Sequence, residues 1–233
     1  MKVLVACEYS GIVRDAFIKK GHNAISCDLL PSESGFGEHY QGDVVDILYE
    51  DWDMMIAFPP CTYLTITGNR WFYHPEDKHL PTDERRPHPL HPNRRELQKE
   101  ALDFVSLLLN APINKIALEN PIGAISSNIK KPNQIIQPYQ YGHDTAKSTC
   151  LWLKNLPLLK PTNIVEPISF KMGDGKNYNK LHYETFKLRV EERWKVRSAT
   201  FPSHDRGKQK RFRHMEIMCM LKCRLCSLMG KVL

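Results

Sequence analysis

Short apolar runs alternate with polar turns from residue 2 to residue 154, and this pattern predicts an α/β fold. Residues 2–7, KVLVAC, form a Val-rich run typical of a buried strand, and residues 22–27, HNAISC, form a second one. Between them, residues 12–20 carry apolar side chains at helical spacing, and Gly21 ends the helix. A strand, a helix and another strand in direct succession indicate the opening of a parallel sheet.

Further strands are expected at 53–58, 114–121 and 148–154, and residues 42–47 end another strand or open a turn. Residues 94–110 predict an amphipathic helix with one apolar face. The intervening loop, 62–93, is rich in His, Pro, Arg and aromatic residues and has no clean period, which indicates either a disordered or a functional loop. We therefore expect a mainly parallel sheet flanked by helices in one α/β domain over residues 1–203.

The composition is that of a globular protein, with 42% hydrophobic and 25% charged residues. No apolar run reaches the ~18 residues that a membrane-spanning helix needs, and the N-terminus lacks the pattern of a secretory signal. The seven Cys are mostly isolated, which favours reduced thiols and a cytoplasmic location.

The net charge of +7 is concentrated at the C-terminus. Residues 204–233 hold eight Lys or Arg against two acids, so that this tail carries most of the excess. A basic tail suits the phosphates of a nucleic acid. The alternative is a solvated end without a specific partner.

Three predicted strands end in reactive or polar corners: CEYSG at 7–11, PPC at 59–61 and ENP at 119–121. Because ligands of open parallel sheets bind beyond the carboxyl ends of the strands, the three corners predict one site. Asp28, at the end of the second strand, is placed to accept hydrogen bonds from a ribose.

Each corner also has a simpler interpretation. Cys61 is a candidate nucleophile if its pKa is lowered, although an isolated Cys is more often structural. Glu119 is a candidate partner for a ring nitrogen, or else a helix cap or a surface acid. Amino-group methyltransferases place Asp or Asn before two prolines and an aromatic residue after them, so Phe58 and Cys61 disfavour that chemistry.

The order of YSG, the acid after the next strand, GDV, PPC and ENP resembles the cytosine 5-position DNA methyltransferase family. The resemblance runs from residue 2 to residue 154, and the most specific part is the spacing of PPC at 59–61 and ENP at 119–121. YGHDTAKSTCLWL, at 141–153, is similar to the next motif of the family, and VRSATFP, at 196–202, faintly resembles its Phe-Pro motif. The compact chain looks like the small phage and prophage forms.

The resemblance implies a Rossmann-like fold of the S-adenosylmethionine-dependent methyltransferase type and a role for each matching residue. Cys61 would attack carbon 6 of cytosine while Glu119 holds ring nitrogen 3. S-adenosylmethionine would be bound by Cys7, Glu8, Tyr9, Ser10, Gly11, Asp28, Leu29, Asp43, Val44 and Phe58. The DNA substrate would be bound by Pro60, Asn120, Lys147 and Arg70. Loop 62–93 would act as a closing lid, and its arginines, like the basic tail, would contact phosphates.

Two other functions stay open. The family usually inserts a target-recognition domain where this chain has only 163–203, which motivates transfer to a free nucleotide instead of DNA. Glu8 stands where a Gly is usual, and Lys147 and Thr149 stand where two Arg are usual. Glu8, Thr149 and the altered C-terminal end, where the final Asn-rich motif of the family is not visible, motivate a non-catalytic protein, for example a phage factor, that binds nucleic acid or a host protein.

We expect no metal site. Cys219, Cys223 and Cys226, with His214 nearby, are compatible with a metal, but the same segment fits an amphipathic helix better. The histidines of loop 62–93 lie in a Pro-rich stretch that favours an extended chain.

Overall fold

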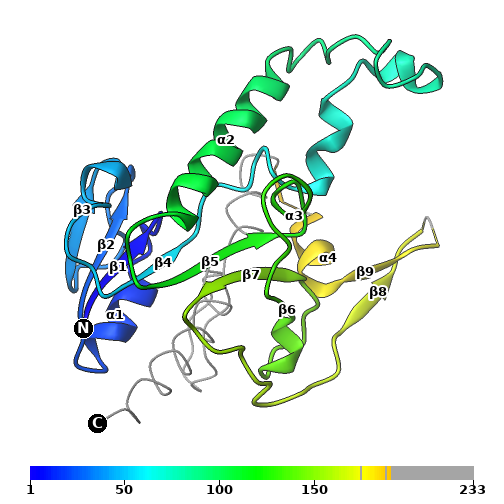
Figure 1. Ribbon diagram of the computed structural model, residues 1–233. Coiled ribbons are helices and arrows are strands. Elements are labelled where there is room, and N and C mark those ends of the chain that lie inside the picture. Colours follow the sequence, from blue (N-terminus) through cyan, green and yellow to red (C-terminus); the bar gives the residue numbers. More distant parts are fainter. Residues whose placement is uncertain (174, 187, 190–233) are drawn as a thin grey trace.

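The computed structural model describes residues 1–173, 175–186 and 188–189 (Figure 1). The basic tail at 204–233, the Phe-Pro motif at 196–202 and the cysteines near the C-terminus lie outside the described residues, as does the predicted domain boundary. None of the helices in the described ranges combines the length and the apolar character needed to cross a bilayer.

Within these residues, seven strands form one sheet in the order β3-β2-β1-β4-β5-β7-β6. The first five strands of this order run parallel to one another, and β7 runs antiparallel to both β5 and β6. Their bounds are β1 Lys2–Ala6, β2 Asn23–Asp28, β3 Glu38–Gln41, β4 Met54–Ala57, β5 Lys115–Pro121, β6 Gln134–Ile136 and β7 Thr149–Lys154. The predicted mainly parallel sheet is confirmed, and its strand order reverses between β1 and β4.

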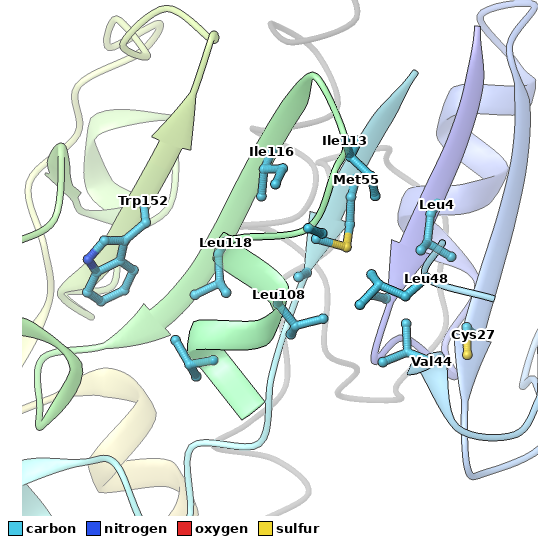
Figure 2. Packing of buried hydrophobic residues seen from close by; sticks show 14 of the residues in the cluster. Leu4, Cys27, Val44, Leu48, Met55, Leu108, Ile113, Ile116, Leu118 and Trp152 are labelled. Carbon is cyan, nitrogen blue, oxygen red and sulfur yellow. The ribbon is translucent and has the colours of Figure 1, made fainter. Parts of the chain in front are cut away.

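Successive strand residues point to opposite sides of the sheet, so that apolar side chains lie on both faces. Helices cover both of these faces. On one face, Val3 and Val5 pack with Phe17 of α1 (Ile12–Ile18). On the other face, Leu4 and Met55 pack with Leu108 of α2 (Arg94–Leu109), the helix that the sequence predicts at 94–110 (Figure 2). The sheet is therefore a rigid layer whose carboxyl edge is free to carry a site.

Shorter elements fill the connections. They are the 3₁₀ helices η1 (Val44–Asp46), η2 (Ile66–Trp71), η3 (Pro75–His79) and η4 (Pro138–Gln140), together with α3 (Ile125–Asn128), the hairpin β8 (Ser169–Lys171) and β9 (Asn177–Asn179), and α4 (Lys180–Phe186). Figure 1 shows residues 62–93, hereafter the arm, extending away from the sheet beside α2. The arm is thus a partly regular extension that contains two 3₁₀ helices.

Candidate functional site

The first corner, after β1, places the Glu8 carboxylate at the start of α1. Glu8 is buried and accepts hydrogen bonds from the backbone N–H groups of Val13 at 2.7 Å and Arg14 at 3.3 Å. The Ser10 hydroxyl donates to the same carboxylate at 2.9 Å. An acid at the first turn of a helix satisfies amides that lack helical partners. Glu8 and Ser10, both expected to bind the cofactor, thus hold α1 in place.

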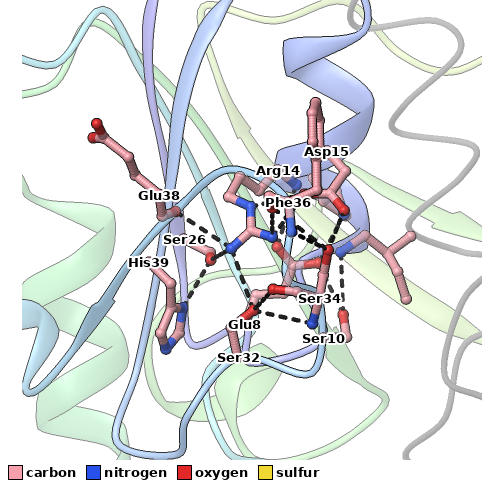
Figure 3. A network of polar contacts seen from close by, with 12 residues as sticks. Glu8, Ser10, Arg14, Asp15, Ser26, Ser32, Ser34, Phe36, Glu38 and His39 are labelled. Carbon is pink, nitrogen blue, oxygen red and sulfur yellow. Dashed lines mark hydrogen bonds and ion pairs between the residues drawn. The ribbon is translucent and has the colours of Figure 1, made fainter.

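Arg14 is the hub of a polar network beside this corner that the sequence analysis missed (Figure 3). Its fully buried guanidinium donates to the Ser26 hydroxyl at 2.9 Å and to the carbonyls of Phe36 and Glu38. Gly11 adopts φ 73°, and a Cβ there would lie 2.4 Å from Arg14 Nη2. The sequence signal that could have revealed this network is a basic residue among the apolar residues of 12–18. Gly11 is explained by this close approach.

A cavity of about 360 Å³ opens at the carboxyl edge of the sheet. Its lining includes half of the residues that were expected to bind S-adenosylmethionine, together with Pro60 of the PPC corner. The lining residues are Cys7, Cys27, Asp28, Leu29, Gly42, Asp43, Val44, Pro60, Thr62, Tyr63, Ala101 and Phe104. The cavity lies beside the point where the strand order reverses, the place where ligands bind in such sheets.

The two carboxylates of the cavity are oriented by backbone amides. Asp28 Oδ1 accepts from Leu30 N at 3.0 Å, and Asp43 Oδ1 accepts from Val45 N at 3.0 Å. Burial raises the pKa of Asp28. Cys7, which lines the same cavity, has φ 59°, a left-handed conformation that is uncommon outside glycine.

The other expected cofactor residues lie outside this lining. Phe58 packs against the cluster on the α1 face of the sheet, and Glu8 and Ser10 face α1. Gly11 faces Arg14, and Tyr9 is likewise absent from the cavity wall. The residues that the sequence did not single out are Cys27, Gly42, Thr62, Tyr63, Ala101 and Phe104. Of these, the two α2 residues belong to the apolar face predicted for that helix.

The PPC and ENP corners are locked together at the same edge. Asn120 is buried, and its Nδ2 donates to the Pro59 carbonyl at 2.9 Å. Ala124 N donates to the Leu64 carbonyl at 2.7 Å, next to Gly123. A Cβ on Gly123 would lie 1.8 Å from that carbonyl oxygen, so only glycine allows the two segments to approach so closely.

Lys147 joins these corners because β7 runs antiparallel to β5. The start of β7 therefore lies beside the end of β5, with Pro121 opposite Thr149. The Lys147 N–H donates to Gln137 Oε1 at 2.9 Å, and its carbonyl accepts from the Thr149 hydroxyl at 3.2 Å. Thr149 is fully buried.

Cys61, Glu119 and Lys147 interact electrostatically. Burial raises the pKa of the Cys61 thiol, Glu119 raises it further, and Lys147 opposes both effects. Burial also raises the pKa of the Glu119 carboxyl, and Lys147 lowers it. The three groups therefore form one coupled cluster of a thiol, a carboxyl and a cation, and Pro60 and Thr62 of the cavity wall flank Cys61 in the chain.

The arginines in and after the arm are engaged to different degrees. Arg70 is exposed and lies over the Trp71 ring at 4.9 Å, whereas Arg86 pairs with Asp77 at 2.6 Å. This pair holds the pKa of Asp77 well below its usual range. Arg94 is buried. Arg70 thus remains the better placed of these residues for a phosphate.

Within the described ranges, no group of three or more His, Cys, Asp or Glu side chains is arranged to hold a metal ion. His88 and His91 instead pack edge-on against Trp71, with ring centroids 5.0 and 5.1 Å away.

No protein-family model and no curated protein matches the chain. Among the solved structures that are similar to it, two match most of its length. A protein described as a DNA modification methyltransferase encoded within a prophage (E. coli) is 14% identical over 71% of this chain, with a TM-score of 0.40. A triple mutant of DNMT2 from Spodoptera frugiperda is 16% identical over 73%, with a TM-score of 0.34. The chain spans 52% and 58% of the lengths of those two chains.

Proposed function

We propose that the protein transfers a methyl group from S-adenosylmethionine to carbon 5 of cytosine in DNA. The observation that supports this most strongly is the cluster of Cys61, Glu119 and Lys147 beside a cavity that contains two oriented carboxylates. It joins a nucleophile, an acid and a cation at the edge where an α/β sheet binds its ligand.

The cavity fits the proposed cofactor in size and chemistry. Its volume of about 360 Å³ lies within the range of about 300–1,000 Å³ typical of small-molecule sites. Leu29, Val44 and Phe104 provide apolar walls for a purine, while Asp28 and Asp43 provide acceptors for hydroxyl or amino groups. When bound, S-adenosylmethionine would supply an electrophilic methyl group.

The side chains of the cluster would divide the remaining chemistry. The Cys61 thiolate would form a bond to carbon 6 of the cytosine, which makes carbon 5 nucleophilic. Burial raises the pKa of the Glu119 carboxyl, which makes protonation easier than for a free Glu, and the protonated carboxyl would donate to ring nitrogen 3. After methylation, water or another base would take the proton from carbon 5, and the electron pair of that C–H bond would form the 5,6 double bond and expel Cys61 as the thiolate.

The neighbouring residues would bind the rest of the substrate. Lys147 belongs to the cluster, and Asn120 follows Glu119 in β5 and donates to the Pro59 carbonyl. Pro60 lines the cavity next to Cys61 in the chain, and Arg70 offers an exposed guanidinium on the arm. The target base would have to leave a duplex or arrive unpaired to reach Cys61.

The first experiment is transfer of a labelled methyl group to unmethylated DNA, followed by digestion and identification of the labelled nucleoside. We expect labelled 5-methylcytosine with the wild-type protein and none with Cys61→Ser. Cys150→Ser is the matched control, because Cys150 is a buried thiol opposite Asn120 in the sheet, and it should retain transfer.

Full transfer by Cys61→Ser would exclude the covalent mechanism. Labelled dCMP without labelled DNA would move the acceptor to a free nucleotide. Absence of both transfer and cofactor binding by calorimetry would contradict the proposal.

A further inference from the structure

The first two turns of α2 hold the chain directly after Cys61. Arg94 Nη2 donates to the Thr62 carbonyl at 3.1 Å, and Gln98 Nε2 donates to the Tyr63 carbonyl at 2.8 Å. These carbonyls belong to the first and second residues after Cys61, and both residues line the cavity. Two side chains of one helix thus fix the backbone between the candidate nucleophile and the cavity wall.

Arg94 occupies a position where a cation is not expected to stabilise the fold. It is only 5% exposed, and it opens α2, where the positive end of the helix dipole disfavours a cation. Burial lowers its pKa. Its guanidinium lies 5.3 Å from the rings of both Tyr63 and Phe72, and Gly68 leaves it room, since a Cβ there would lie 2.2 Å from Nη2. A buried cation is costly unless its contacts are well matched.

The same side of α2 also builds the cavity. Ala101 and Phe104 line it, at helical spacings from Arg94 and Gln98 that place all four residues on one side of the helix. Further along this helix, Val105 and Leu108 are buried against the sheet. The helix therefore links the sheet, the cavity wall and the turn that follows Cys61.

We propose that Arg94 and Gln98 are positioning residues that fix the turn carrying Cys61 beside the cavity. The expected effect on catalysis rests on the proposed function. The expected effect on the position of the Cys61 turn does not depend on it. The two hydrogen bonds also limit how the arm can move. Because α2 holds residues 62 and 63, only the rest of the arm is available to close over a substrate.

The test compares Gln98→Met and Arg94→Met with Gln134→Met. Gln134 is the matched control. It lies in the edge strand β6, and its Nε2 donates to a backbone carbonyl in the same way, to Leu159 at 2.7 Å. Iodoacetamide alkylation of each Cys is followed by peptide mass spectrometry, so that the readout does not need methyl transfer. We expect Cys61 to react about tenfold faster in the two α2 variants, with Cys150 unchanged, because the turn loses its anchor.

In the methyl-transfer assay, the α2 variants should lower kcat by about 10- to 100-fold with little change in KM for DNA, as expected for a misplaced reacting group. The control variant should match the wild type in both assays. Equal Cys61 alkylation and equal kcat in a folded Gln98→Met variant would overturn the proposal.

Two further outcomes are distinguished by the same design. If Arg94→Met does not fold, Gln98→Met carries the test, because Gln98 is only half-buried. If the wild type transfers no methyl group, the proposed function fails, while the ratio of Cys61 to Cys150 alkylation still decides whether α2 positions Cys61. A rise in Cys150 alkylation equal to that of Cys61 would indicate general loosening and reject the positioning role.

Discussion

Burial raises the pKa of the Cys61 thiol most, Glu119 raises it further, and Lys147 lowers it. Removing either charged neighbour should therefore move the pKa of Cys61 in a known direction. In Glu119→Gln the alkylation of Cys61 should begin at lower pH, and in Lys147→Met at higher pH. The measurement is the alkylation rate of Cys61 from neutral to strongly alkaline pH, with the exposed Glu166→Gln as control. Shifts of the same sign in both variants would contradict the coupled cluster.

The position of Glu8 leads to a prediction about stability. Its carboxylate accepts from the N–H groups of Val13 and Arg14, and an amide keeps the shape but turns a donor toward one of them. Glu8→Gln should therefore lower the free energy of unfolding by about 1–2 kcal/mol. For a chain of this size, Tm should fall by about 2–8 °C. S-adenosylmethionine affinity should stay unchanged, and a large loss of affinity at unchanged Tm would instead assign Glu8 to the cofactor.

At the scale of elements, the joint between the PPC and ENP segments depends on Gly123. A methyl group there meets the Leu64 carbonyl at 1.8 Å, so one of the two segments must move. We expect Gly123→Ala to cost at least about 2 kcal/mol in urea unfolding, as for other strained or overpacked sites. Gly35→Ala is the control: its Cβ meets nothing within 4 Å, and the change should lie within about 0.5 kcal/mol of the wild type or slightly stabilise. Equal stability of the two variants would contradict the close approach.

The parts of the fold that could be predicted from the sequence are those whose apolar pattern is distinct over the whole element. The Val-rich strand at 2–6 and the helix at 94–109 carry enough apolar residues to be recognised locally. β6 is very short, and the η helices are hardly longer, so their existence depends on contacts with distant segments. β8 and β9 are equally short, which explains the weak pattern after residue 163.

The candidate site also has residues whose place could be predicted from the sequence and residues whose place could not. Asp28 and Asp43 follow strand ends or turns, so their place at the cavity follows from topology. Glu8 and Ser10 occupy an equivalent corner, but their side chains turn to α1, and only the tertiary structure reveals that choice. Gln98 looks like an ordinary helix-surface residue in the sequence, as does Arg94, because the carbonyls that they hold lie at the far end of the arm in chain order.

For the molecule as a whole, the cavity connects cofactor binding to folding stability. A ligand that binds only the folded state stabilises it by about 2.7 kcal/mol at 100 times its Kd, which corresponds to about 5–11 °C in Tm for a chain of this length. Saturating S-adenosylmethionine should therefore raise the Tm of the wild type in a thermal melt. Asp28→Asn and Asp43→Asn should reduce that rise, because each removes a charged acceptor from the cavity wall. Asp53→Asn, directly before β4 and away from the carboxyl edge, is the control and should keep the full rise measured against its own ligand-free Tm. A rise that survives both cavity substitutions would place the cofactor elsewhere, whereas its loss in those two variants alone would tie the cofactor to the cavity beside Cys61.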